Sequence, residues 1–269
     1  MKHPPLLRQN SELRQLGIYN FTLPAWVTRL PDGRTINVCP QAGACVKLCY
    51  ARNGTYNFPN VKTAHQRNLQ LTLDDLGKFT TRLITELDQP RFRKKRPPHL
   101  PNLDRGHLHP HVAQLLDEGA PIVRIHDSGD FYSDDYTHAW AHIATLRPDT
   151  LFYAYTKEVT RTRRVLGTTG PPNLLLVYSL GGKEDHLLDL AEGGDQHADV
   201  FPNEQAITDA GYYNQDPHDL LSVVAPSTRI GIPANPIPHI NKKMGGQTFG
   251  QIEQQTTRHN RNKKKGNNQ

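Results

Sequence analysis

Short apolar runs and longer amphipathic stretches alternate along most of the chain. Apolar runs that are typical of buried strands are centred near Ile36, Val123, Phe152, Leu176, Val200 and Val223. Apolar residues at helical spacing occupy the ranges 60–89, 110–120, 133–148, 160–169 and 203–213. Repeated strand–helix units of this kind predict an α/β protein with a parallel sheet covered by helices.

Capping residues and glycines mark several of the expected helix ends. Ser133 suits the N-cap of the helix at 133–148, and Gly119 closes the helix at 110–120. The range 60–89 is interrupted at LTLDDL, where Thr72 or Asp74 is expected to cap a second helix. No GxGxxG follows a strand and no GxxxxGKS/T occurs, so the usual nucleotide-binding motifs of an open sheet are absent. The pattern leaves a barrel and an open sheet as alternatives.

Positive charge is concentrated in two stretches of an otherwise mildly acidic chain, whose net charge is +6. Five basic residues lie in RFRKKR, Arg91 to Arg96, and five more lie in the last stretch, residues 251–269. That stretch is rich in Gln, Asn and Lys and has hardly any apolar residue, which predicts a disordered basic tail. Arg91–Arg96 and residues 258–269 are candidates for binding the phosphates of DNA or RNA, although solvated basic surfaces have the same composition.

The chain shows no recognisable targeting or membrane segment. Its first residues, MKHPPLLRQN, lack an apolar run of signal-peptide length, and no stretch approaches the length of a membrane span. We therefore expect a cytoplasmic protein with no membrane partner. In a reducing compartment a structural disulfide is disfavoured, and clustered cysteines are more often metal ligands or catalytic thiols.

All three cysteines of the chain lie in one stretch, CPQAGACVKLCY, at Cys39, Cys45 and Cys49. Structural zinc requires four ligands, usually including a pair with the spacing C-x2-4-C. The spacings here are C-x5-C and C-x3-C, so zinc needs a distant fourth ligand, for which His65 and Asp130 are candidates. An iron–sulfur cluster normally takes four cysteines, and with three of them one iron stays open to another ligand. Both kinds of centre remain alternatives at this point.

Polar and glycine-rich segments follow three of the expected strands. HDSGDFYS follows the strand at Val123, TKE follows the strand at Phe152, and SLGGKEDH follows the strand at Leu176. The carboxyl ends of parallel strands meet at one edge of a sheet, where α/β proteins place their chemistry. Turns favour the same residue types, so a single loop of this kind would mean little. Three such loops beside a cysteine cluster predict a site at this edge.

The stretches CPQAGACVKLCYARNGTY and VRIHDSGDFYSDDY resemble the radical S-adenosylmethionine (SAM) enzymes, and in particular the phage and bacterial branch known as gene product 88. The resemblance implies a partial (β/α)6 TIM-like barrel at residues 18–250, between an N-terminal arm at 1–17 and the tail at 251–269. It implies a [4Fe-4S] cluster held by Cys39, Cys45 and Cys49, with SAM on the remaining iron. A reductant protein of flavodoxin or ferredoxin type would supply the electron.

The sequence departs from the radical SAM pattern in two places. The usual spacing C-x3-C-x2-C is C-x5-C-x3-C here, and the usual aromatic residue before the last cysteine is replaced by Leu48. Tyr50, which follows the last cysteine, is the residue that the resemblance places near the adenine.

The resemblance also assigns residues at the strand ends to SAM. Ser128, Gly129 and Asp130 are similar to a family motif that hydrogen-bonds the SAM amino group. Lys157 and Ser179 suit the SAM carboxylate and ribose by their strand-end positions.

We therefore expect a radical SAM-type enzyme that cleaves SAM reductively to modify an unidentified substrate, with a nucleic-acid base as one candidate. The alternative is a non-catalytic phage protein that binds zinc or a cluster through its cysteines and nucleic acid through its basic segments.

Overall fold

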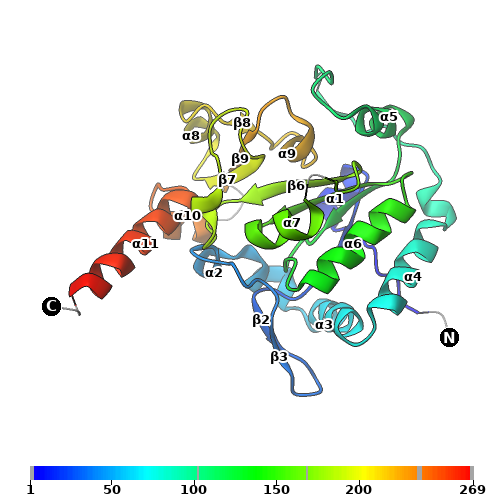
Figure 1. Cartoon of the computed structure of the whole chain (residues 1–269), viewed down its shortest axis with the longest axis horizontal. Helices are drawn as coiled ribbons and strands as arrows, with labels where there is room; N and C mark the ends of the chain where they lie inside the picture. Colours follow the sequence, from blue (N-terminus) through cyan, green and yellow to red (C-terminus); the bar gives the residue numbers. More distant parts are fainter. Residues whose placement is uncertain (1–2, 102, 168, 235–237, 267–269) are drawn as a thin grey trace.

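The computed structural model describes residues 3–101, 103–167, 169–234 and 238–266 (Figure 1). Its centre is a seven-stranded sheet in the order β1-β4-β5-β6-β7-β9-β8, and all neighbouring strands are parallel. The strands are β1 (Ile18–Phe21), β4 (Ile122–Ile125), β5 (Leu151–Thr156), β6 (Leu174–Ser179), β7 (His197–Phe201), β8 (Tyr213–Asn214) and β9 (Arg229–Pro233).

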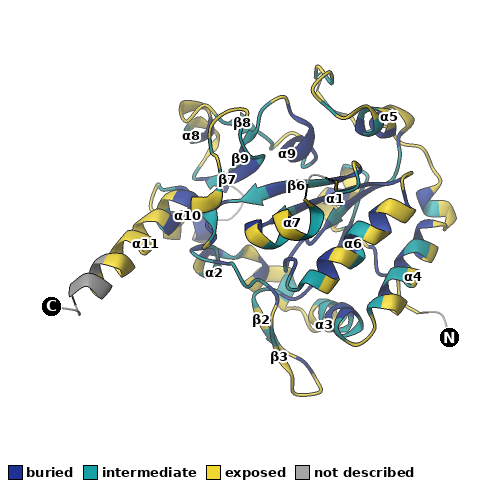
Figure 2. Cartoon of the chain, viewed as in Figure 1, coloured by how far each residue is buried: buried dark blue, intermediate teal, exposed yellow. Residues whose placement is uncertain are grey.

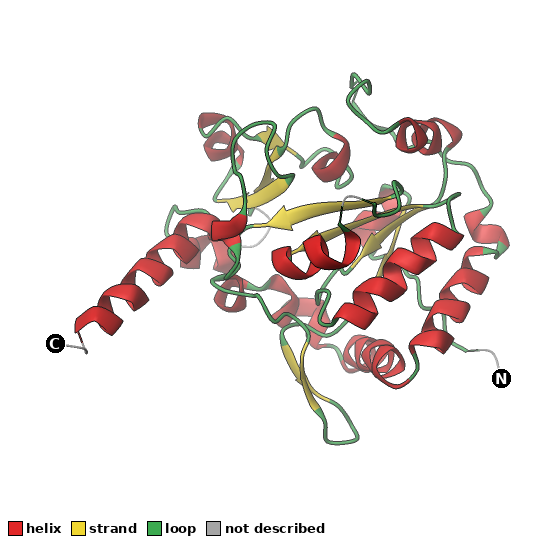
Figure 3. Cartoon of the chain, viewed as in Figure 1, coloured by secondary structure: helices red, strands yellow, loops and turns green. Residues whose placement is uncertain are grey.

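Helices cover both faces of this sheet, as Figure 3 shows. Successive side chains of a strand point to opposite faces, so the buried rings of Phe152 and Tyr153 on β5 enter two different apolar layers. The Phe152 layer includes α3 (Pro59–Asp74), α4 (Leu76–Leu87) and α6 (Asp134–Leu146); the Tyr153 layer includes α1 (Ser11–Gln15), α5 (Pro110–Glu118) and α9 (Leu221–Val224). The remaining helices are α2 (Cys45–Leu48), α7 (Val159–Leu166), α8 (Glu204–Asp209), α10 (Pro238–Met244) and α11 (Phe249–Gly266).

None of the helices in the described ranges is long and apolar enough to cross a membrane.

Most of the expected strands and helices are confirmed. The strands predicted near Val123, Phe152, Leu176 and Val200 are β4, β5, β6 and β7. Ser133 caps α6 by accepting a hydrogen bond from the Tyr136 N–H, and Gly119 ends α5 with a φ of +67°. The range 60–89 divides into α3 and α4, but the cap is Asp75, whose carboxylate accepts the Lys78 N–H at 2.8 Å.

Two of the expected strands differ in the structure, one in its position and one in its type. The strand near Ile36 is β3 (Thr35–Asn37), which pairs with β2 (Val27–Arg29) in an antiparallel hairpin outside the main sheet. The segment near Val223 is not a strand but the helix α9, all of whose residues are buried. A short apolar run that is buried on all sides has the same composition in a strand and in a helix, so periodicity could not separate them. The sheet is instead completed by β9 and by the edge strand β1, which the sequence pattern did not reveal.

The sheet is open. Within the described residues β1 and β8 form its two edges, and no closed sheet is found, so a TIM-like barrel is not confirmed. The coarser expectation, an α/β fold with a mostly parallel sheet, is confirmed.

The basic tail that was expected to be disordered is helical as far as Gly266, where the described residues end. Its first turn carries a reciprocal cap, in which Thr248 N–H donates to Gln251 Oε1 at 2.9 Å and Gln251 N–H donates to Thr248 Oγ1 at 3.2 Å. This is the capping box T-x-x-Q, a signal that can be read from sequence. The polar composition of the tail favoured disorder, whereas the capping box favoured a helix, and the capping box was the better guide.

We expect Gly231→Ala to destabilise the fold by about 1–3 kcal/mol, the usual cost of overpacking. A Cβ at Gly231 on β9 would lie 2.4 Å from Cγ2 of Ile207 on α8. The check is urea unfolding of Gly231→Ala, Ile207→Ala and the double variant, whose loss of stability should be smaller than the sum of the two single losses. Gly77→Ala, at an exposed position of α4, is the control and should not lower stability. Strict additivity would show that β9 and α8 do not pack as described.

Candidate cysteine site at the carboxyl ends of the strands

The hairpin strand β3 leads directly into the cysteine loop, residues 39–49. Asn37 Oδ1 accepts a hydrogen bond from the Cys39 N–H at 3.0 Å, which fixes the start of the loop. Cys45 begins the helix α2, and Cys49 follows its last residue. All three thiols are free of disulfides and partly buried.

Backbone hydrogen bonds hold this loop against the loop that follows β6. The Gly181 carbonyl accepts hydrogen bonds from the N–H groups of Gly43 and Cys45, at 3.1 and 3.3 Å. The Lys183 N–H donates to the Gln41 carbonyl at 2.8 Å. The cysteine loop therefore lies at the carboxyl end of β6, where the sequence predicted a site.

Two buried glutamates complete the attachment of the cysteine loop. Glu158, just after β5, accepts the Gln41 N–H at 3.0 Å through Oε1. Glu253, on α11, accepts the Ala44 N–H at 2.6 Å through Oε2. A Cβ at Gly43 would lie 2.2 Å from that same oxygen, so any larger residue there would displace the Glu253 carboxylate. Residues far apart in the sequence thus fix the backbone on either side of Gly43.

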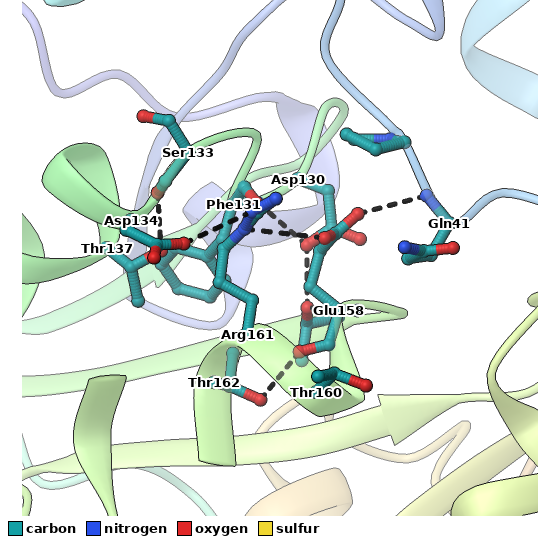
Figure 4. Close-up of polar contacts among 12 residues, drawn as sticks. Gln41, Asp130, Phe131, Ser133, Asp134, Thr137, Glu158, Thr160, Arg161 and Thr162 are labelled. Carbon is teal, nitrogen blue, oxygen red and sulfur yellow. Dashed lines mark hydrogen bonds and ion pairs between the residues drawn. The ribbon is translucent and has the colours of Figure 1, made fainter. Parts of the chain in front are cut away.

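Glu158 sits in a crowded polar environment, which Figure 4 shows. Its other oxygen, Oε2, lies 3.5 Å from Nε of Arg161, and that Nε donates to the Phe131 carbonyl at 3.1 Å. Burial, followed by the nearby charge of Asp130, raises the pKa of Glu158 to about 8. The raised pKa favours the protonated form of the Glu158 carboxyl group near neutral pH.

Asp130 joins the carboxyl ends of β4 and β5. Its Oδ1 accepts hydrogen bonds from the Phe131 N–H at 2.8 Å and from Thr156 Oγ1 at 2.6 Å. Its Oδ2 accepts the Lys157 N–H at 2.9 Å. Burial raises the pKa of Asp130, and these hydrogen bonds oppose the shift. The side chain therefore organises the strand ends.

Lys157 extends the same link to β6. Its Nζ donates to the carbonyl and the hydroxyl of Ser179, both at 2.7 Å, and to the Leu180 carbonyl at 2.9 Å. Asp130, Lys157 and Ser179 therefore form one chain of contacts across three strand ends. The structure brings together the candidates that the sequence placed on separate loops.

Ser128 and Gly129 contact the end of β1. Ser128 Oγ donates to the Leu23 carbonyl, and the Ser128 carbonyl accepts the Leu23 N–H at 3.1 Å. Gly129 has a φ of +87°, and a Cβ there would lie 2.6 Å from Cβ of Leu23. Glycine is therefore required at 129 by both conformation and close packing.

Tyr50 lies between the cysteine loop and β4. Its hydroxyl donates to the Asp127 carbonyl, while the Tyr56 hydroxyl donates to Asp127 Oδ2 at 2.5 Å. The Tyr50 ring meets the Tyr56 ring edge-on, with 5.7 Å between centroids, and the rest of the side chain is partly exposed. An aromatic surface is therefore available next to Cys49.

The electrostatics of the three thiols differ. Burial, followed by the charge of Asp130, raises the pKa of Cys39. The interaction with Cys49, together with the Lys157 charge, lowers the pKa of Cys45 to about 6. The same interaction, followed by burial, raises the pKa of Cys49. Cys45 is therefore the thiol that ionises first.

Within residues 3–101, 103–167, 169–234 and 238–266, no three His, Cys, Asp or Glu side chains are grouped around a single ion position. His65, a candidate fourth zinc ligand, lies against the Tyr56 ring with 5.9 Å between ring centroids, and burial lowers its pKa to about 4. The other candidate, Asp130, has both carboxylate oxygens engaged by hydrogen bonds. A four-iron cluster places its cysteines on different iron atoms, so it does not need ligands gathered around one point.

A family model described as gene product 88 matches residues 4–264. The chain belongs to the gene product 88 family. It is 28% identical to the Gene 88 protein of Mycobacterium phage L5 over 136 residues, which cover 49% of this chain and 47% of that protein. It is 29% identical to the Gene 88 protein of Mycobacterium phage D29 over 133 residues, with the same coverage.

The aligned region therefore spans about half the length of these gene product 88 relatives. No solved structure matches the chain.

Sequence reasoning missed three acidic residues of this candidate site. Glu158 follows Lys157 directly, and Glu253 lies in the tail expected to be disordered. Asp185 accepts the N–H groups of Gly181 and Gly182, at 2.8 and 3.0 Å, and shapes the loop after β6. Glu158 and Asp185 stood inside the quoted strand-end segments, but nothing local distinguished them from ordinary turn residues.

We expect Glu158→Gln to weaken the pH dependence of stability. A carboxyl group whose folded pKa is raised to about 8 is stabilising below its unfolded pKa, and this contribution is lost as pH rises through the folded pKa. Wild-type stability should therefore fall over this window, and Glu158→Gln should fall less, because the amide oxygen still accepts the Gln41 N–H without titrating. Urea unfolding between about pH 5 and pH 8 is the measurement. Glu12→Gln on α1 is the control; identical pH profiles for all three proteins would refute the prediction.

Proposed function

We propose that this protein is a radical SAM-type enzyme that modifies an unidentified substrate, with Cys39, Cys45 and Cys49 as ligands of a [4Fe-4S] cluster. The observation that supports this most directly is the attachment of the cysteine loop. Three free thiols from one loop lie at the carboxyl ends of β5 and β6, and Gly181, Glu158 and Glu253 fix the loop backbone. Parallel α/β folds place their chemistry at this edge.

The topology is compatible with this proposal. Strands β1, β4, β5, β6, β7 and β9 lie side by side in chain order, as successive βα units of a partial barrel would. We propose that these six strands are the counterpart of the (β/α)6 core, with the short strand β8 added at the edge.

The donor set suits an iron–sulfur cluster. The three thiols are partly accessible, Cys45 ionises readily, and the Lys157 charge favours its thiolate form. When bound, such a cluster supplies the electron that splits SAM into methionine and a 5′-deoxyadenosyl radical, which abstracts hydrogen from the substrate. The sequence has no further cysteine for a second cluster, so we propose an external one-electron donor of the flavodoxin or ferredoxin type.

Opposite charges stand next to each other beside the thiols. The Asp130 carboxylate accepts the Lys157 N–H, and the Lys157 ammonium group reaches Ser179. A buried carboxylate and a buried ammonium complement the ammonium and carboxylate of an amino acid, which is how SAM ends. Asp130 uses three of the roughly four acceptor sites of its carboxylate in the hydrogen bonds described above. We therefore assign its remaining acceptor capacity, together with Lys157 and Ser179, to that end of SAM, with Ser128 and Gly129 holding the loop in place. Tyr50 offers an aromatic surface for the adenine.

We expect Cys39→Ala, Cys45→Ala and Cys49→Ala each to abolish iron binding and SAM cleavage, since three ligands leave none to spare. Protein purified without oxygen should be brown, with broad absorption at about 400 nm, and each variant should lose this absorption. Elemental analysis for iron and zinc is the second readout. Lys47→Ala, at an exposed position of α2, is the control and should keep the colour. If the wild-type protein is colourless and contains zinc, the proposed enzyme function is wrong and the protein binds zinc instead.

We expect Asp130→Asn to weaken SAM binding by about ten- to a hundredfold while iron content stays near that of the wild type. The loss corresponds to one charge-assisted hydrogen bond, roughly 1.5–3 kcal/mol. Equilibrium dialysis of SAM against the reconstituted protein measures it. Asp134→Asn is the control. Asp134 is the first residue of α6 and pairs with Arg164 of α7. Unchanged affinity would leave Asp130 as a purely structural link between β4 and β5.

A further inference from the structure

The helix α11 has two halves with different surroundings. Phe249 is buried against Leu48 of α2 and Met244 of α10, and Glu253 is buried against the cysteine loop. From Gln254 to Arg261 every residue is exposed, and Figure 2 shows the helix extending away from the body. The first half belongs to the folded body, and the second half projects into solvent.

The first half is anchored at the same edge of the sheet as the cysteines. Asp199, on β7, accepts the Gly250 N–H at 3.0 Å, and Glu253 accepts the Ala44 N–H. Together with the capping box of Thr248 and Gln251, these contacts set where the helix starts and in which direction it leaves the body. The projecting half is therefore fixed next to the cysteine loop.

The projecting half gains little stability from the rest of the protein. No apolar residue follows Ile252 in the sequence, so this half has no apolar face to bury. Isolated helices of this length are marginal in water, and a helix that is polar all round lacks the packing that normally stabilises one. A helix of this composition is best explained by a partner that complements its polar surface.

The charges indicate the chemistry of that partner. Arg258, Arg261 and Lys263 are exposed, and the sequence contains no acidic residue after Glu253. A polyanion would neutralise these cations, whereas a lipid surface would require the apolar face that is missing. The major groove of B-form DNA admits an α-helix and is flanked by phosphates.

The second basic stretch of the chain does not share this position. Arg91 is engaged internally, since its guanidinium contacts Glu86 and donates to the Leu7 carbonyl at 3.3 Å. The Arg96 N–H donates to the Gly119 carbonyl, just before β4 begins, so this stretch lies near the amino ends of the strands. Figure 1 shows α4 and α5, which flank it, at the opposite end of the molecule from α11. Arg91–Arg96 and α11 therefore cannot form one continuous surface.

We propose that the projecting half of α11, residues 254–266, is a docking surface for nucleic acid, and that it holds the bound polymer beside the cysteine site. The docking itself requires neither a cluster nor SAM. Combined with the proposed function, it makes a nucleic acid the substrate class; that step, and only that step, rests on the proposed function.

The test compares two triple variants that each remove three exposed positive charges. One is Arg258→Gln/Arg261→Gln/Lys263→Gln on α11, and the matched control is Arg93→Gln/Lys94→Gln/Arg96→Gln near the amino ends of the strands. Fluorescence anisotropy of labelled duplex DNA, single-stranded DNA and RNA is measured with metal-free full-length protein over a range of salt concentrations. Circular dichroism checks that both variants stay folded.

The α11 variant should bind more weakly at low salt, with the slope of log affinity against log salt reduced by about 2 to 3, since each lost phosphate contact removes about 0.7–0.9. The control should keep the wild-type slope. Equal slopes for the wild type and the α11 variant would overturn the proposal, as would an equal effect of the control. Absence of binding to all three nucleic acids, or tighter binding to phosphatidylserine vesicles, would also overturn it. Because the protein is metal-free, none of these outcomes bears on the cysteine predictions.

Discussion

The cysteine loop depends on backbone N–H groups that find their acceptors outside the loop. The Gly181 carbonyl takes two of these groups, Glu158 takes the Gln41 N–H, and Glu253 takes the Ala44 N–H. Unpaired buried N–H groups are costly, so these acceptors determine where the loop can lie. The position of the thiols therefore follows from backbone hydrogen bonding to two strand ends and one distant helix.

The same edge of the sheet holds several buried ionisable groups. Asp130, Glu158 and Asp185 lie around Lys157, and burial raises the pKa of all three carboxyl groups. Each is nevertheless paired with N–H or hydroxyl donors, which is the condition for keeping polar groups inside a protein. An arrangement of this kind costs stability, and perturbed pKa values are typical of functional sites. Membership of the gene product 88 family does not specify a reaction, so the proposal depends on this chemistry.

The helix α11 connects the cysteine site with the exposed basic surface. Its first turns close the cysteine site through Phe249, Gly250 and Glu253, and its exposed turns carry basic residues into solvent. The two halves belong to one continuous helix, so a partner on the outer half is positioned relative to the thiols. The cysteine loop therefore depends on the first half of the helix, through the contact between Glu253 and the Ala44 N–H.

The sequence by itself determined the local features of this protein. Apolar runs near Val123 and Phe152 specified buried parallel strands, and the clustering of Cys39, Cys45 and Cys49 indicated a site at the strand ends. The resemblance to gene product 88 also came from local stretches. Only the tertiary structure decided that the apolar run near Val223 is a helix and that the tail docks through Glu253. Burial on every side and contacts across some two hundred residues decided these points, and neither leaves a periodic pattern in the sequence.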